Sequence, residues 1–290
     1  MQKSILLFSI FVFSLFTSCG QNKKTDYVVT IKTEYGEMIA ILYDETPKHK
    51  ENFIKLAKEK FFDSTLFHRV IPEFMIQGGD PNSKKATPGQ PLGTGGPGYT
   101  VDAEFVPQYF HHKGALSAAR LGDGQNPQKA SSGSQFYIVQ GKVWKENELK
   151  IDQQKLGMGL QQMLAKPENK TLYDSIVKIY QAGDMKAYEA CIIGLVPRIV
   201  KETGVPVIKE MSADRLNAYT TVGGAPHLDD QYTVFGKVIK GLEVVDKIAA
   251  VQRDRSDRPT QDVRMFITVE ELSKKKIEKL YGYQYPEVKK

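Results

Sequence analysis

One stretch of the chain gathers residue types that could hold a peptide bond. It reads Phe67-His68-Arg69-Val70-Ile71-Pro72-Glu73-Phe74-Met75-Ile76-Gln77-Gly78-Gly79-Asp80-Pro81. Alternate residues of a strand share a face, so Arg69 and Ile71 lie together, as do Met75 and Gln77 beyond the Pro72 kink. A guanidinium and an amide beside apolar side chains suit a neutral peptide carbonyl next to an apolar side chain. The stretch contains no nucleophile with an adjacent base.

Other residues with possible chemistry have simpler interpretations. His111 and His112 are adjacent, so in a strand they point to opposite faces, and no cluster of cysteines or carboxylates joins them; we predict no metal site and no cofactor. The glycines between Gly93 and Gly98 lack the Lys-Ser/Thr ending and the following helix of a phosphate loop, which favours turns. Asp229-Asp230 also fits turn chemistry better than calcium ligation.

The elements around this stretch are mostly short strands. Tyr27 to Tyr43 reads as two β-rich runs around a turn, and further strands are predicted at 114–119, 134–140 and 231–238. A helix begins at Pro47, with Thr46 as its N-cap, and a second covers 242–250. Many short strands with turn signals and two helices predict a mainly β protein, a barrel or a sandwich.

The pattern becomes helical between Trp144 and Tyr219. Apolar residues three and four apart predict helices over 149–164, 172–180 and 187–200, the last with Cys191 as a buried structural thiol. This segment therefore reads as a helical insertion at about 144–217. From Ser273 onward the chain is amphipathic and basic, which predicts a short surface helix in a C-terminal tail, 273–290.

The N-terminus has the pattern of an export signal. Lys3 precedes an apolar run from Ile5 to Phe16, which is shorter than the ~20 residues of a membrane-spanning helix. The run ends in small residues before Cys19 and resembles a bacterial lipoprotein signal. We therefore expect a signal peptide, 1–18, a lipidated Cys19 and a polar tether, 19–26, which would anchor the protein in the bacterial cell envelope, at the periplasmic side or the outer membrane. The alternative is a plain signal peptide in which Cys19 is incidental.

Composition and charge narrow the possible partners. The 290 residues include 40 Lys plus Arg against 34 Asp plus Glu, and 41% are hydrophobic, which is ordinary for a globular protein and excludes intrinsic disorder. The basic residues do not cluster with aromatic or groove-reading motifs, so we expect no nucleic-acid partner. Two cysteines exclude a disulfide framework.

At residues 67–81 the chain closely resembles the cyclophilin family of peptidyl-prolyl cis/trans isomerases. Four more segments agree in order: Thr46-Pro47 with Glu51-Asn52-Phe53, Gly93-Thr94-Gly95-Gly96-Pro97-Gly98, Gly133-Ser134-Gln135-Phe136-Tyr137-Ile138 and Tyr232-Thr233-Val234-Phe235-Gly236-Lys237-Val238. The resemblance implies an eight-stranded antiparallel barrel capped by two helices, over 27–272, with the helical insertion extending from a loop on the active-site side.

The resemblance also assigns roles to residues. It implies that Arg69 is the principal catalytic residue, facing the prolyl peptide and stabilising the twisted bond, with Gln77 holding Arg69 or the substrate and Phe74 in the apolar pocket for the proline ring. The further residues implied to bind the substrate, an X-Pro-containing peptide or unfolded exported protein, are His68, Met75, Ala119, Arg120, Gln135, Tyr137, His227, Leu228 and Tyr232. No metal or other cofactor is implied.

Four positions depart from the commonest family pattern. Tyr137 stands where a second pocket Phe is usual, and its hydroxyl needs a partner. Tyr232 replaces a frequent His, and Arg120 replaces a frequent Asn, which alters specificity for the residues before proline. His227 stands where many eukaryotic members have a Trp that contacts cyclosporin, so we expect weak cyclosporin binding.

Two functions from different classes follow. The first is an active isomerase that accelerates X-Pro steps in the folding of exported proteins, and the intact Arg69, Phe74 and Gln77 favour it. The second is a binding module in which the barrel and insertion grip a partner or an unfolded chain. The insertion can also be a structural elaboration without a binding role. Removing Trp144 to Asn217 while keeping the barrel would separate these interpretations.

Overall fold

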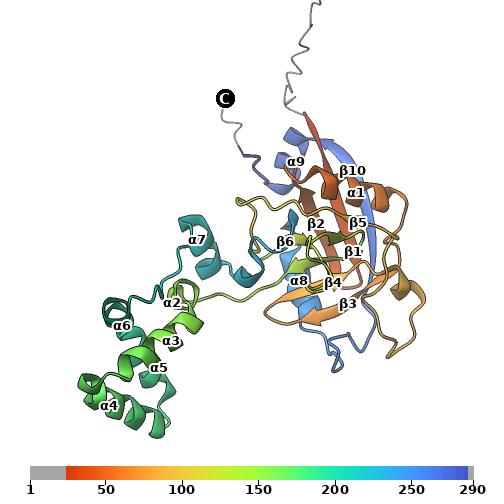
Figure 1. Cartoon of the computed structure of the whole chain (residues 1–290). Coiled ribbons are helices and arrows are strands. Elements are labelled where there is room, and N and C mark those ends of the chain that lie inside the picture. The colour runs from red at the N-terminus through yellow and green to blue at the C-terminus, as the bar shows by residue number, and fades with distance from the viewer. Residues whose placement is uncertain (1–23, 287–290) are drawn as a thin grey trace, which may run out of the picture.

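A closed antiparallel barrel is the centre of the fold in the computed structural model, which describes residues 24–286. The barrel order is β1-β10-β3-β4-β8-β6-β9-β2, and β5 pairs with β7 outside it (Figure 1). The predicted eight-stranded barrel is therefore confirmed. The predicted signal peptide and the lipidation residue Cys19 lie outside the described residues.

The strands are β1 (Thr25–Thr33), β2 (Gly36–Leu42), β3 (Thr65–Ile71), β4 (Met75–Gly78), β5 (Thr100–Val101), β6 (Ala115–Ala118), β7 (Ser131–Ser132), β8 (Phe136–Val139), β9 (Val234–Lys240) and β10 (Arg264–Ser273). The helices are α1 (Pro47–Lys58), α2 (Glu146–Lys150), α3 (Gln153–Leu164), α4 (Lys170–Gln181), α5 (Met185–Gly194), α6 (Val196–Thr203), α7 (Ala213–Thr221), α8 (Leu242–Ala249) and α9 (Lys274–Tyr281). Three short 3₁₀ turns lie at Pro81–Lys85, Pro167–Asn169 and Pro226–Leu228.

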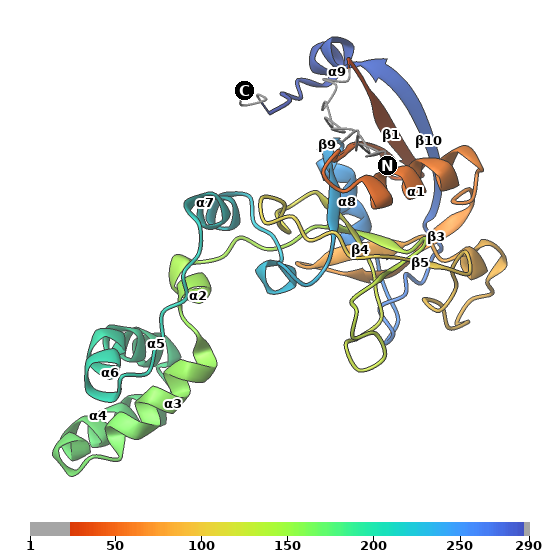
Figure 2. The same ribbon diagram turned by 45° about the horizontal axis from the view of Figure 1, so that its top comes forward.

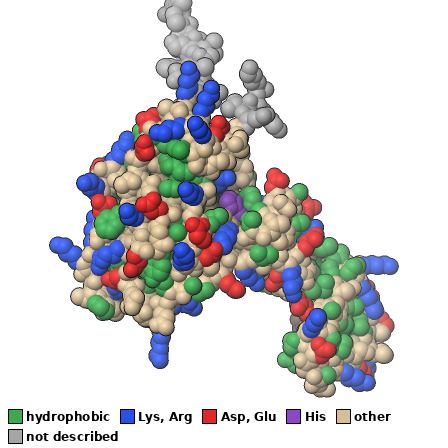
Figure 3. Space-filling model, turned by 180° about the vertical axis from the view of Figure 1, so that it is seen from behind, with side chains coloured by type: hydrophobic (Ala, Val, Ile, Leu, Met, Phe, Trp, Pro, Cys, Tyr) green, Lys and Arg blue, Asp and Glu red, His purple; other side chains and the backbone are tan. Residues whose placement is uncertain are grey.

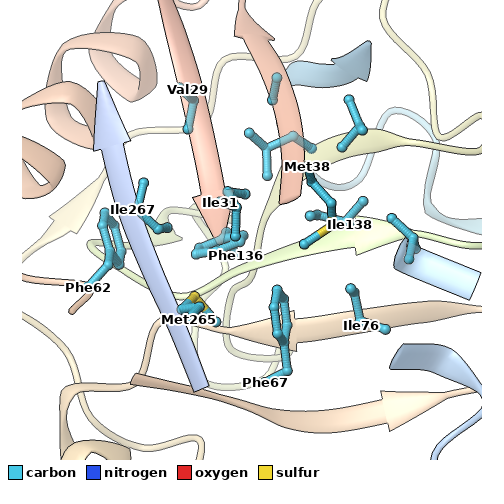
Figure 4. Close-up of a cluster of buried hydrophobic side chains, with 14 of the residues drawn as sticks. Val29, Ile31, Met38, Phe62, Phe67, Ile76, Phe136, Ile138, Met265 and Ile267 are labelled. Carbon is cyan, nitrogen blue, oxygen red and sulfur yellow. The ribbon is translucent and has the colours of Figure 1, made fainter. Parts of the chain in front are cut away.

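Apolar side chains from every wall fill the barrel interior (Figure 4). Phe62 and Phe67 each meet Phe136 edge to face, an arrangement that aromatic rings prefer. The helices α1 and α8 contribute Phe53 and Val245 to the same cluster, so they cover the interior as the sequence predicted. This burial makes the barrel a rigid support for the side chains on its outer face.

The insertion is helical, and the helix expected over 172–180 is confirmed as α4, whereas the other two expected helices are each divided. The expected helix over 187–200 is two helices, because Pro197 lacks an N–H and its ring excludes the carbonyl four residues earlier. The expected helix over 149–164 is divided as well, since Asp152 accepts a hydrogen bond from the Lys155 N–H and begins a new helix. Cys191 is partly exposed and packs at the edge of the hydrophobic cluster formed by the insertion helices, which corrects the expectation that it is buried.

The helices α3 to α6 form a distal lobe, 153–203, which packs around its own hydrophobic cluster. Met163, Ile199 and Val207 are fully buried in this cluster, which shares no residue with the barrel interior. The lobe projects away from the barrel in two views (Figure 1 and Figure 2). It is joined through a neck in which two chain segments pair: Asp152 N–H donates to Val207 O at 2.8 Å, and Lys209 N–H donates to Lys150 O at 2.7 Å.

The C-terminal tail packs on the barrel instead of extending from it. Ser273 caps α9 by accepting from the Lys276 N–H, and Ile277 is fully buried against Val28 and Ile41. Charged side chains of both signs are scattered over the face in Figure 3, as expected of a solvated surface. Among residues 24–286, no helix has both the length and the apolar character needed to span a membrane.

The neck defines where the distal lobe can be removed. We expect that replacing residues 153–206 by Asn-Gly, with Val207→Thr, leaves a folded barrel, because a two-residue turn closes an antiparallel pair. The free energy of unfolding of the barrel should change by less than about 1 kcal/mol in denaturant titrations followed by circular dichroism.

The matched control is the wider removal of 144–217. It deletes Trp144 and Arg215, whose indole and guanidinium bond to Gly224 O and Asp230 on the barrel side. We expect this version to lose about 2 kcal/mol or more. Equal stability of the two shortened chains would contradict the separation of neck and lobe.

Candidate active site

Strand register places three polar or aromatic side chains in one row. Arg69 on β3 pairs with Gln77 on β4, and Gln77 pairs with Tyr137 on β8. Paired residues on neighbouring strands project from the same face of a sheet. The row therefore lies on one face, and the next pair along it, Ile71 with Met75, adds apolar side chains beside Arg69.

A bulge at His68 turns Arg69 away from the barrel interior. Phe67 pairs with Gly78, whereas Arg69 already pairs with Gln77, so one extra residue is present on β3. Phe67 and Val70 both lie in the interior cluster, which strict alternation would not allow for residues three apart. The bulge thus lets β3 keep two interior side chains and still present Arg69 on the outer face.

A chain of side-chain amides holds Arg69 in position. Its Nη1 donates to Gln77 Oε1 at 3.2 Å, and Gln77 Nε2 donates to Gln135 Oε1 at 3.2 Å. Gln135 is anchored in turn, since its Nε2 donates to the carbonyls of Gly93 and Gly95 at 2.9 and 2.8 Å. The glycine-rich turn therefore fixes the orientation of the amides, and the amides fix one edge of the guanidinium.

A pocket of about 110 Å³ opens beside this chain. Its walls consist of two guanidiniums, one amide and a set of apolar and aromatic side chains: Arg69, Phe74, Met75, Gln77, Ala119, Arg120, Tyr137, Leu228 and Tyr232. All nine are residues that the sequence analysis assigned to catalysis or substrate binding. A pocket of this size suits a small apolar ring, with the Arg69 guanidinium at its edge.

Three of the predicted site residues lie outside that pocket. Gln135 belongs to the amide chain, and His68 lines an adjoining cavity of about 490 Å³ together with Arg69 and Gln77. His227 is exposed, with its ring 5.1 Å from that of Phe74. Burial lowers the pKa of His68 to about 4, and the nearby Asp80 opposes this, so its ring is neutral at pH 7 and adds no second charge beside Arg69.

The hydroxyl of Tyr137 has a partner that sequence reasoning missed. His111 is fully buried; its Nε2 lies 2.9 Å from Tyr137 Oη and its Nδ1 lies 3.0 Å from Asp229 Oδ1. Burial lowers the pKa of His111, although the Asp229 carboxylate opposes it. The neutral ring then donates a hydrogen bond from Nδ1–H to the carboxylate and accepts a hydrogen bond from the Tyr137 O–H at Nε2. A tyrosine in place of the usual phenylalanine was the signal that a partner exists.

The same carboxylate connects the pocket wall to α7. Tyr219 Oη donates to both oxygens of Asp229, at 2.8 and 2.7 Å, and Arg215 makes two bonds of 2.9 Å to Asp230. Gly224 is required where these groups converge, because a Cβ there would lie 2.3 Å from His111 O. Asp229 and Asp230 are expected as turn residues. In the structure they also connect the pocket wall to α7, which we call the base of the insertion.

No set of three histidine, cysteine or carboxylate side chains that could hold a metal ion occurs within residues 24–286. His111 and His112 are both engaged elsewhere, His112 through its Nδ1 to the Lys113 carbonyl at 2.8 Å. The arrangement can bind and polarise an amide through hydrogen bonds, and its pocket can hold an apolar ring beside that amide.

We expect Tyr137→Phe to lower the free energy of unfolding by about 1–3 kcal/mol, because His111 Nε2 then stays buried without its donor. The ring that lines the pocket is kept, so binding of an apolar ring should change little. Denaturant titration of both proteins measures the loss, with Tyr173→Phe on the exposed face of α4 as the matched control. Equal stability of Tyr137→Phe and wild type would contradict the His111 bond.

Comparison with known proteins identifies the family. The sequence model of the cyclophilin type peptidyl-prolyl cis-trans isomerases matches residues 28–159 and 212–269, which is more than half of the chain. The unmatched segment between them contains most of the distal lobe. A solved structure of a cyclophilin type isomerase from Cryptosporidium parvum has a TM-score of 0.48 and 20% identity, and the match covers 85% of this chain and 98% of that chain.

Curated relatives agree with the family match. Proteins of Staphylococcus epidermidis and Staphylococcus aureus named as peptidyl-prolyl cis-trans isomerases are each 32% identical, over 81% of this chain and 87% of theirs. A longer protein of Streptococcus pyogenes, named as a bifunctional phosphatase/peptidyl-prolyl cis-trans isomerase, is 34% identical over 81% of this chain, which spans 37% of that protein. With the family model and these relatives in agreement, the chain belongs to the cyclophilin type peptidyl-prolyl cis-trans isomerases.

Proposed function

We propose that this isomerase accelerates X-Pro isomerisation in the folding of exported proteins, with Arg69 acting on the twisted amide. The observation that carries the proposal is the Arg69–Gln77–Gln135 chain beside a small apolar pocket. Within residues 24–286 the remaining N–H groups of Arg69 have no hydrogen-bond partner, so they are available to a substrate.

The chemistry requires binding rather than a covalent step. Rotation about an X-Pro bond breaks amide resonance and crosses a barrier of about 18–20 kcal/mol. In the twisted state the nitrogen is pyramidal and its lone pair can accept a hydrogen bond, whereas in the planar amide that lone pair is delocalised. A guanidinium N–H aimed at this nitrogen therefore binds the twisted form better than either planar form, which lowers the barrier.

The other site residues would fix the substrate around Arg69. Phe74, Met75, Tyr137 and Leu228 form the apolar walls that suit the proline ring. Ala119, Arg120, Gln135 and Tyr232 then lie along the groove for the residues before it. His227 near Phe74 offers less apolar area than a tryptophan, so weak cyclosporin binding stays a prediction.

The insertion supports a second candidate function, a binding module. Its distal lobe exposes Met158, Tyr173, Tyr180 and Met185 while keeping a separate core. The version shortened at the neck tests this role directly: unchanged turnover of peptides with loss of protection of unfolded chains from aggregation would assign binding to the lobe.

We expect Arg69→Ala to reduce kcat/KM for an X-Pro peptide by about 10²–10³-fold, the loss typical of removing a donor to a transition state. Arg69→Lys should recover little, because an ammonium cannot reproduce the guanidinium fork. The measurement is an isomerisation assay on the mature chain, with folding matched by circular dichroism.

Arg198→Ala provides the matched control for Arg69→Ala. It removes a half-exposed arginine on α6 of the distal lobe and should leave turnover unchanged. Folded wild-type protein without activity on any X-Pro peptide would refute the proposed function and shift the weight to the binding module.

We also propose that Cys19 carries the lipid that anchors the protein to the cell envelope, on the periplasmic side or at the outer membrane. Strand β1 begins at Thr25, so only a short stretch of sequence separates the barrel from Cys19. Cys19→Ala should abolish incorporation of a labelled fatty acid and move the protein from the membrane fraction to the soluble fraction. Retained label in Cys19→Ala would show that lipidation occurs elsewhere.

A further inference from the structure

Arg120 places a second guanidinium in the proline pocket. It lines both the pocket of about 110 Å³ and the adjoining cavity of about 490 Å³, as Arg69 does. Its side chain is 4% exposed and lies over the ring of Tyr232, with 4.4 Å from Cζ to the ring centroid. A guanidinium this well buried is costly unless its donors are satisfied.

Two of the three guanidinium nitrogens of Arg120 donate hydrogen bonds to residues within 24–286, and the third does not. Its Nε donates to Gln231 O at 2.9 Å, and its Nη1 donates to Leu121 O at 2.9 Å and to Asp123 Oδ1 at 2.6 Å. These bonds hold the plane of the group. Its Nη2 makes no hydrogen bond or ion pair with any residue between 24 and 286, so a substrate can take both of its donors.

The charges around the two cavities favour an anion. Arg69 and Arg120 face both cavities, and no carboxylate lines the smaller one. Arg258 and Asp254 line the larger cavity, but Arg258 is bound to Asp262 at 3.0 Å and to two backbone carbonyls. Lys129 adds a positive charge on the protein side of Arg120, since its Nζ donates to the side chain of Gln231, whose backbone carbonyl accepts from Arg120 Nε. Asp123, 63% exposed, is the carboxylate that competes for Arg120.

We propose that Arg120 makes this isomerase selective for X-Pro bonds preceded by an acidic side chain. The inference rests on the proposed function, in which Arg69 takes the prolyl amide and the groove at Arg120 takes the residues before proline. A carboxylate oxygen from one of those residues can accept an N–H of Arg120 Nη2 in a charge-assisted hydrogen bond. Tyr232 below the guanidinium keeps that edge in place.

The test uses peptides that differ in one side chain. In one series Glu, Gln or Lys stands directly before proline; in a second series it stands one residue earlier, with Ala before proline. We expect kcat/KM for Glu to exceed that for its neutral isostere Gln by roughly three- to tenfold in one of the two series, the range for partly exposed and charged hydrogen bonds. The preference should shrink at high ionic strength. Exchange measured by NMR avoids the selectivity of a coupling protease.

Two variants should move the Glu/Gln ratio in opposite directions. Arg120→Gln removes the charge and should bring the ratio to about one, whereas Asp123→Asn removes the competing carboxylate and should enlarge it. Each ratio is measured within one protein, so a change in the folded fraction cancels.

The outcomes separate the two levels of the proposal. No turnover of any peptide by folded protein would refute the isomerase function itself. Turnover without a Glu preference in either series would overturn the inference about Arg120 alone, and so would a preference that persists in Arg120→Gln.

Discussion

The pairing register of β3, β4 and β8 is the constraint on which the site depends. Arg69, Gln77 and Tyr137 reach the same face because each is paired directly with the next. A slip of one residue on any of these strands would send its side chain into the barrel interior. The interior prevents the slip, since Phe67, Ile76 and Phe136 fill it from the same strands and cannot be replaced by a guanidinium or an amide. Apolar packing on one face therefore fixes the chemistry on the other.

The pocket is also supported from outside the barrel. Tyr137 bonds to His111, His111 to Asp229, and Asp229 to Tyr219 on α7, so one buried network runs from the pocket wall into the base of the insertion. The base and the distal lobe are different in kind. The base shares hydrogen bonds with the site, whereas the lobe packs on itself beyond a neck of two paired segments.

The sequence predicts the barrel and most of the pocket because these features depend on short, continuous segments of the chain. The uninterrupted run at 67–81 and the order of the glycine-rich and strand segments identify the family, and all nine residues that line the pocket were anticipated. The His68 bulge was not, because strand alternation assumes one residue per pair. For His111 and Asp229 the sequence indicates only structural and turn roles, because the contact between them joins segments more than 100 residues apart. The division of the helix at Pro197 was visible in the sequence, but the apolar periodicity across it outweighed the proline.

Arg120, which stands where the family often has Asn, also needs partners that compensate for its charge. A small amide at this position would need no support, whereas a guanidinium must be held flat and partly neutralised to be buried. The chain provides an aromatic face in Tyr232, two backbone carbonyls and the Asp123 carboxylate. These partners satisfy the edge of the group that faces the protein and leave the opposite edge open to the groove. An apolar side chain could fill this position without such partners, so we attribute the burial of a guanidinium here to the charge selectivity proposed above.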